Sequence, residues 1–188
     1  MIDNLYDQAR TDDIAVAGIY CDFWGQAEQS TLNILGAILK QLVGEREIPE
    51  HVLQAFQKTK RESGSRGLRV PDLTRMLKTA IALIPRVFIC IDALDEVRPR
   101  HLSKLLTSLQ DIVRESPNTR VFLTGRAHIV GEIKENLPGA VVAPLSSTEG
   151  DIETYLKMRL GQDPKPDAMD GDLRADILEL IPEKCSPM

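Results

Sequence analysis

Residues 87–96 read VFICIDALDE, and this stretch decides the fold. Its first five residues are apolar without a break, which is typical of a parallel strand covered by helices on both faces. The run ends in Asp92, and two further carboxylates follow at Asp95 and Glu96. Because ligands in open α/β sheets bind outside the carboxyl ends of the strands, we expect a ligand site at these three residues.

Three other apolar, β-branched runs predict strands at residues 14–23, 120–124 and 140–144. Segments with helical periodicity lie between and after these runs. Their expected ranges are 32–42, 71–84, 102–113, 129–136, 151–160 and 173–181. Strands that alternate with helices predict βαβ crossovers, and hence an α/β fold with a parallel sheet and helices on both of its faces.

The composition is that of a globular domain. Of the 188 residues, 43% are hydrophobic, and 23 basic side chains stand against 28 acidic ones, for a net charge of -5. This balance argues against a dedicated nucleic-acid binder, which needs an excess of Lys and Arg to replace phosphate counterions. No apolar run has the length of a membrane span, and the three cysteines show no metal-ligand spacing. We therefore expect a cytoplasmic domain with reduced cysteines, Cys21 and Cys90 among its core thiols.

Two interpretations of the acidic stretch are open from spacing alone. Oxygen ligands suit Mg²⁺, which takes one or two carboxylates, so Asp92 is a candidate metal ligand. Asp95 or Glu96 could then orient or deprotonate an attacking water. In the other interpretation Asp92 caps the following helix, while Asp95 and Glu96 are solvated.

The next predicted strand ends in Thr124-Gly125-Arg126. An arginine at the carboxyl end of a strand beside the acidic strand could contact a terminal phosphate with two N–H groups. The alternative is a structural ion pair between Arg126 and Asp92 or Asp95. Taken alone, the residues favour the ion pair, because charges outside a recognised motif are usually structural or solvated.

A resemblance adds to these observations. VFICIDALDE resembles the Walker B segment of the NACHT-type NTPases, which belong to the signal-transduction ATPases with numerous domains (STAND). FLTGRAHIVGEI, residues 122–133, is similar to the sensor strand of that family. The likeness is closest to fungal proteins with a nephrocystin-like N-terminal NTPase domain, often joined to ankyrin or WD repeats. Residues 20–43, 151–160 and 172–188 also resemble segments of these proteins, in the same order.

The resemblance implies a P-loop NTPase fold of the ASCE type, with ATP and Mg²⁺ as cofactors. Asp92 would be the Mg²⁺-associated aspartate, and Asp95 and Glu96 the acidic pair that positions water. Arg126 would sense the γ-phosphate, with Thr124 beside it. The usual triplet in the wider family is TSR, so Gly125 in this chain lacks a possible hydroxyl contact. Implied partners are other domains of the parent protein or a homo-oligomer formed through the NTPase core, with no nucleic acid and no membrane.

One motif of that family is missing. The sequence contains no GxxxxGK[ST] and no Gly-Lys pair at all, so it lacks the loop of backbone N–H groups and the lysine that hold the phosphates. We therefore expect weak or no nucleotide binding, and little ATPase activity, from this chain alone. The expected organisation is a partial NTPase core at 1–160 without its first strand and P-loop, a linker at 161–172, and the truncated start of a helical extension at 173–188.

The missing strand has a structural consequence. Relatives order their strands 5-1-4-3-2, and strand one would separate residues 120–124 from residues 140–144. Without it, both segments have unpaired backbone groups, so we expect either a gap or direct pairing between the two.

Three functions are compatible with these observations. The first is a partial NACHT signalling NTPase, in which ATP drives a conformational switch. The second is a non-catalytic interaction module that docks through its open sheet edge. The third, an unrelated Mg²⁺-dependent phosphotransfer fold, does not explain the order of the motifs.

Overall fold

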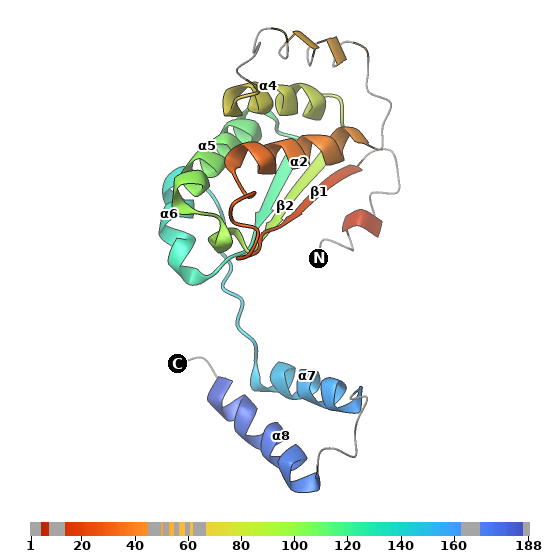
Figure 1. Ribbon diagram of the computed structural model, residues 1–188, viewed down its shortest axis with the longest axis vertical. Helices are drawn as coiled ribbons and strands as arrows, with labels where there is room; N and C mark the ends of the chain where they lie inside the picture. The colour runs from red at the N-terminus through yellow and green to blue at the C-terminus, as the bar shows by residue number, and fades with distance from the viewer. Residues whose placement is uncertain are drawn as a thin grey trace. The chain divides into compact units, whose positions relative to one another are not determined.

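The computed structural model describes residues 5–7, 14–44, 50, 53–54, 57–58, 61, 67–162 and 170–185 (Figure 1). The chain divides into two compact units, Met1–Ala140 and Val141–Met188. The first unit contains the sheet, and the second consists of an extended segment and two helices. Each is described by itself.

The sheet has three parallel strands, β1 (Ile14–Tyr20), β2 (Arg86–Asp92) and β3 (Thr119–Leu123), in the order β1-β2-β3. The register aligns Ala17 with Ile89 and Ile89 with Val121. The parallel α/β fold and three of the four expected strands are therefore confirmed. Their order is that of strands two, three and four in the arrangement expected above.

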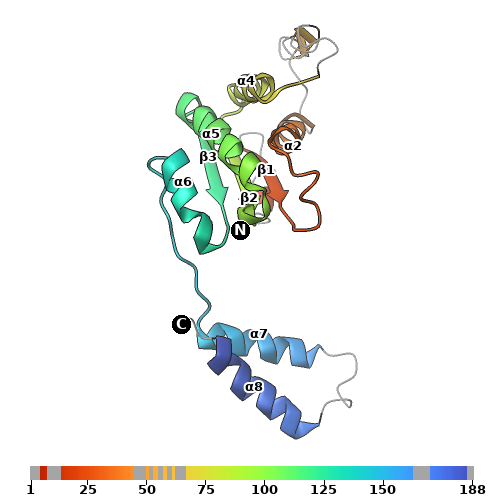
Figure 2. The same ribbon diagram turned by 60° about the vertical axis from the view of Figure 1, so that its left-hand side comes forward.

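Three long helices lie on one face of this sheet: α2 (Thr31–Gly44), α4 (Val70–Ile81) and α5 (Pro99–Glu115) (Figure 2). They enclose the core with the side chains of Ala17, Ile89 and Val121. Because each crossover is right-handed and both step across the sheet in the same direction, all three helices come to the same side. Helices were expected on both faces of the sheet; among the described residues, the long helices cover one face. On the other face, the rings of Phe88 and Phe122 lie 6.2 Å apart.

The apolar stripe predicted within residues 102–113 is confirmed in α5 except at Val113, which is exposed. Five of its side chains are almost completely buried, namely Leu102, Leu105, Leu106, Leu109 and Ile112. The short helix α6 (Val130–Asn136) packs against α5, and a 3₁₀ turn, η3 (Ala127–Ile129), leads into it. This packing holds the loop after β3 close to the end of β2.

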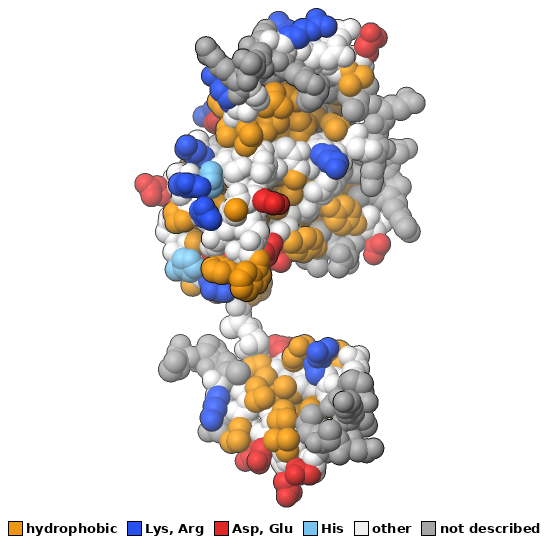
Figure 3. All heavy atoms as spheres, viewed as in Figure 1, with side chains coloured by type: hydrophobic (Ala, Val, Ile, Leu, Met, Phe, Trp, Pro, Cys, Tyr) orange, Lys and Arg blue, Asp and Glu red, His pale blue; other side chains and the backbone are white. Residues whose placement is uncertain are grey.

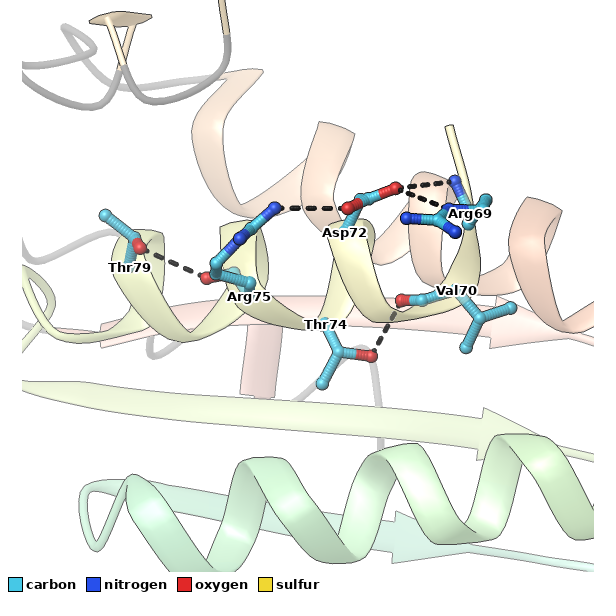
Figure 4. A network of polar contacts seen from close by, with 6 residues as sticks. All are labelled: Arg69, Val70, Asp72, Thr74, Arg75 and Thr79. Atoms are coloured by element: carbon cyan, nitrogen blue, oxygen red, sulfur yellow. Dashed lines mark hydrogen bonds and ion pairs between the residues drawn. The ribbon is translucent and has the colours of Figure 1, made fainter. Parts of the chain in front are cut away.

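A polar network organises α4 (Figure 4). Asp72, in its first turn, accepts a hydrogen bond from the backbone N–H of Arg69 at 3.2 Å and pairs with the guanidinium groups of Arg69 and Arg75 at 3.5 and 3.1 Å. An acidic side chain is favourable here because it compensates the positive end of the helix dipole. The hydroxyls of Thr74 and Thr79 donate to the carbonyls of Val70 and Arg75, one turn earlier. The network fixes where α4 begins.

The outer edge of β1 is closed by a side chain. The carboxamide of Gln41, in α2, accepts from the N–H of Gly18 at 2.9 Å and donates to its carbonyl at 2.9 Å. The hydroxyl of Tyr6 contacts both Gln41 and the Gly18 N–H. Gln41 thus takes the place of a neighbouring strand and protects an edge that would otherwise be open to pairing with another chain.

The strand predicted at 140–144 is wrong. Residues 140–148 have no regular secondary structure, and Val141 is 95% exposed. Direct pairing with residues 120–124, one of the two expected outcomes, is absent from the described sheet, whose order is β1-β2-β3. A short β-branched run becomes a strand only when a neighbouring strand pairs with its backbone and covers its side chains.

The second unit contains α7 (Glu149–Gly161) and α8 (Gly171–Cys185), which pack on each other. Thr148 and Asp151 form a reciprocal capping box: the Thr148 hydroxyl accepts from the Asp151 N–H at 3.2 Å, and the Asp151 carboxylate accepts from the Thr148 N–H at 2.9 Å. Residues 163–169 of the expected linker and residues 186–188 lie outside the described residues. The boundaries at 160 and 172 stay predictions. None of the described helices combines the length and the apolar character needed to cross a membrane.

Candidate functional site

The carboxyl ends of the three strands bring all the predicted site residues to one edge of the sheet. Backbone hydrogen bonds join the loops that follow the strands. The Cys21 N–H donates to the Asp92 carbonyl at 3.0 Å, the Thr124 N–H to the Ile91 carbonyl at 3.0 Å, and the Leu94 N–H to the Thr124 carbonyl at 2.9 Å. The loop after β2 is therefore held between the loops after β1 and β3.

Asp92 and Thr124 contact each other directly. The Thr124 hydroxyl donates to Asp92 Oδ1 and accepts from the Ala93 N–H at 3.1 Å. Ala93 has a left-handed conformation, with φ 52° and ψ 47°, which is strained for a residue with a side chain. This turn leads into η2 (Leu94–Glu96), which is anchored by the completely buried Leu94. The interpretation of Asp92 as a helix cap is wrong, because its carboxylate binds the neighbouring loop instead.

Arg126 pairs with both acidic residues of that turn. Its Nε lies 3.4 Å from Asp95 Oδ2, and its Nη2 lies 3.4 Å from Glu96 Oε1. The Arg126 backbone N–H also donates to Asp95 Oδ1, at 3.2 Å. The Asp95 side chain is 6% exposed and that of Arg126 is 76% exposed. The acidic pair is thus bound rather than solvated, and the ion pair with Asp95, one of the two alternatives above, is the observed one. The role of Arg126 as a phosphate sensor stays a prediction.

Gly125 lies at the closest approach between the two loops. A Cβ atom at this position would lie 2.7 Å from Ile129 Cδ1 and 3.3 Å from Asp95 Oδ1. A larger residue would require the Ile129 side chain, at the end of η3, to shift. Packing against Ile129 therefore disfavours a side chain at position 125, whereas the sequence alone showed only the loss of a hydroxyl.

Two residues at this edge, Cys21 and Asp22, were not among the predicted site residues. Cys21 is buried, as expected for a core thiol. Burial, followed by the negative charges of Asp92 and Asp22, raises the pKa of the Cys21 thiol to about 11. The sequence did indicate both residues, because they lie near the carboxyl end of the strand predicted at 14–23. Asp92 was singled out for the equivalent position on its own strand.

The residues described do not form a Mg²⁺ site by themselves. Asp92 offers one carboxylate oxygen beyond the one bound by Thr124, while Asp95 and Glu96 are paired with Arg126. No group of three His, Cys, Asp or Glu side chains in the described part of the chain is arranged to hold a metal ion. A Mg²⁺ ion at this edge would therefore need further ligands from phosphate oxygens and water.

The close contact at Gly125 predicts the effect of restoring the family's serine. Gly125→Ser should lower the free energy of unfolding by about 1–3 kcal/mol, because overpacking forces neighbouring atoms to move. Ile129→Val removes the obstructing Cδ1, so the double variant should lose less than the sum of the two single variants. Urea denaturation of the unmodified chain, the two single variants and the double variant measures the coupling energy between positions 125 and 129. Gly131→Ser is the matched control, since a Cβ at Gly131 meets nothing within 4 Å. Equal losses at Gly125 and Gly131 would contradict the proposed contact.

The environment of Cys21 predicts its reactivity. Its rate of alkylation by iodoacetamide, followed on the Cys21 peptide by mass spectrometry, should keep rising with pH above about pH 9, where an exposed thiol levels off. Asp92→Asn removes a negative charge and should move the midpoint of this profile to lower pH, whereas Asp111→Asn, on an exposed part of α5, should not. A midpoint that Asp92→Asn leaves unchanged would show that the two groups are not adjacent.

Comparisons with known proteins identify the family of this chain. The family model described as "Nephrocystin 3, N-terminal" matches residues 1–126. A comparison with curated protein sequences found no match. Among solved structures, a Walker-type ATPase of Pyrococcus abyssi is similar, with a TM-score of 0.47 and 14% sequence identity. That match covers 95% of this chain, which spans 60% of the archaeal chain. Since the family model covers most of the sheet-containing unit, the chain belongs to the family of nephrocystin 3 N-terminal domains.

Proposed function

We propose that this chain is the acidic and sensor part of a nucleotide-dependent switch, in a cytoplasmic NACHT-type signalling NTPase. One observation carries the proposal: a single loop, residues 124–126, contacts all three carboxylates of the loop after β2. Thr124 binds Asp92, and Arg126 binds Asp95 and Glu96. A ligand that moves this loop therefore changes the surroundings of the whole acidic group at once.

Each residue has a role in this proposal. Asp92 would be the residue that holds a Mg²⁺ ion, through the one carboxylate oxygen that Thr124 does not bind and together with phosphate oxygens of the nucleotide. Arg126 would move toward the terminal phosphate of the nucleotide, because the doubly charged phosphate offers it a bidentate contact. Asp95 and Glu96, released from the guanidinium, would then orient the attacking water.

The ion pairs of Arg126 are suited to such an exchange. Arg126 is largely exposed, so its pairs are screened by water, and pairs of this kind contribute about 0–1 kcal/mol. A phosphate group can compete with interactions of this size. By contrast, Asp92 and Thr124 are bound inside the loop and would remain in place. The proposal therefore predicts a movement of Arg126 over a fixed β2–β3 frame.

Nucleotide affinity in this proposal requires a phosphate-binding loop, which the 188 residues do not contain. Slow turnover suits a switch, because exchange or hydrolysis then changes the contacts of the domain with other domains or with further copies of itself. The second candidate, a non-catalytic interaction module, is favoured by the same lack of a phosphate loop. The two candidate functions predict different nucleotide affinities once a phosphate-binding loop is added to the chain.

Isothermal titration calorimetry with Mg²⁺-ATP tests the proposal on two proteins. The first is the 188-residue chain, for which we expect no binding tighter than about 1 mM. The second carries at its N-terminus a strand, GxxxxGKT loop and helix grafted from a nephrocystin-like relative, and should bind at about 1–100 μM. In the grafted protein, Asp92→Ala and Arg126→Ala should each weaken binding about tenfold or more, since each removes a charge-assisted contact.

Asp111→Ala in the grafted protein is the control, because Asp111 lies on an exposed part of α5, where its carboxylate pairs with Arg114 at 3.2 Å. Micromolar binding by the ungrafted chain would overturn the requirement for a phosphate loop. A folded grafted protein without nucleotide affinity would support the interaction module instead.

A further inference from the structure

The turn after β1 holds two aromatic side chains out in solvent. Phe23 is 62% exposed and Trp24, the single tryptophan of the chain, is 91% exposed. Their rings contact each other edge to face, with centroids 5.6 Å apart and an interplanar angle of 83°. Exposure of a large apolar ring to water is unfavourable, and tryptophan is among the residues most enriched at the centres of protein interfaces.

This aromatic turn, residues 22–29, is held rigidly by its own hydrogen bonds. The Asp22 carboxylate accepts from the Gly25 N–H at 2.6 Å, and the Asp22 carbonyl accepts from Gln29 Nε2 at 2.8 Å. The Gly25 carbonyl accepts from the N–H groups of Glu28 and Gln29 at 2.9 and 3.2 Å. Because the backbone of the turn is already ordered, little conformational entropy is lost when a partner binds it.

A basic turn lies beside the aromatic turn. Arg98, Arg100 and Lys104 are exposed around the start of α5, whose first turn has no acidic residue. No ion pair joins any of the three to a carboxylate in the described part of the chain. This concentration of positive charge is unfavourable at the N-terminal end of a helix dipole. It also acts on His101, whose pKa is lowered by partial burial and by the charges of Arg100, Lys104 and Arg98.

The chain segments that carry the two turns are joined by a hydrogen bond. The hydroxyl of Thr31, where α2 begins after the aromatic turn, donates to the carbonyl of His101, in the basic turn, at 2.9 Å. Figure 3 shows Lys and Arg side chains over α5, with acidic and hydrophobic side chains beside them toward the carboxyl end of the sheet. The aromatic turn carries two exposed carboxylates, Asp22 and Glu28, and no Lys or Arg.

We propose that the aromatic turn and the basic turn together form a self-complementary surface, through which two copies of this chain associate about a two-fold axis. In a two-fold contact the same surface is used twice, so the acidic aromatic turn of each copy can face the basic turn of the other. The acidic side chains of the turn, and the net charge of -5, disfavour a nucleic acid as the partner.

The aromatic side chains account for the centre of such an interface. Each can bury about 150–250 Å² of surface, so the four rings of a dimer would contribute a large part of the 1,200–2,000 Å² or so that is typical of a stable complex. The charged side chains would form the rim, where they set the orientation of the copies. The proposed function includes contacts between copies of the domain, and this surface is where we place such a contact. The inference rests on the proposed function for that link alone, because the contact itself needs no nucleotide.

Sedimentation velocity of the full chain without nucleotide tests the inference, at protein concentrations from about 1 to 300 μM. We expect a monomer–dimer equilibrium that weakens as NaCl is raised from about 50 to 500 mM, because salt screens the rim charges. Trp24→Ala should weaken the dimer about tenfold or more, as the loss of a central aromatic side chain does. Glu28→Lys and Lys104→Glu should each weaken it through like-charge contacts, and the double reversal should restore it.

Leu83→Ala is the control, because Leu83 is a half-exposed apolar side chain in the turn after α4 and belongs to neither turn. Circular dichroism checks that each variant is folded. A chain that stays monomeric over the whole concentration range would overturn the inference. So would a dimer that Trp24→Ala and Lys104→Glu leave intact, or one that Leu83→Ala weakens equally. Nucleotide titration is a separate measurement, so either proposal can fail without the other.

Discussion

The hydrogen bond between Thr124 and Asp92 is the contact on which the rest of the site depends. The β2–β3 register places Ile91 opposite Leu123, so the next residues of the two strands, Asp92 and Thr124, meet at the edge. There the Thr124 hydroxyl joins the Asp92 carboxylate to the Ala93 N–H. A slip of one residue would turn Thr124 to the opposite face and break both contacts. The core below the sheet, which includes Ile89 and Ile91, stabilises this register because its apolar side chains can be buried in only one alignment.

Charge is the second constraint at this edge. Four carboxylates, those of Asp22, Asp92, Asp95 and Glu96, lie close enough to raise the pKa of Cys21, with burial as the largest cause. The single guanidinium of Arg126 pairs with two of them. The edge as described is therefore short of positive charge, which is the condition in which a cation or a cationic loop binds favourably. This electrostatic imbalance connects the geometry of the fold to the nucleotide-dependent function proposed above.

The parts of the structure that depend on local sequence were predictable. The unbroken apolar run of β2 and the apolar stripe of α5 determine their own burial, so their positions, the parallel sheet and the shared edge of the site residues all followed from sequence. What depends on distant partners was not predictable. Residues 140–144 have a strand-like sequence, but strand formation needs a neighbouring strand. The ion pair of Arg126 with Asp95 was one of the two expected pairings, but its second pair, with Glu96, depends on the left-handed turn at Ala93. The close contact at Gly125 depends on Ile129, at the end of the 3₁₀ turn η3.

The most direct test of this account is a double-mutant cycle between Asp92 and Thr124, measured as the free energy of unfolding in urea. Asp92→Ala and Thr124→Val remove the two partners separately and together, without changing the apolar core. We expect a coupling energy of about 1.5–3 kcal/mol, the value typical of a hydrogen bond to a charged group. A coupling energy near zero would contradict the claim that this bond joins the two strands and organises the acidic edge.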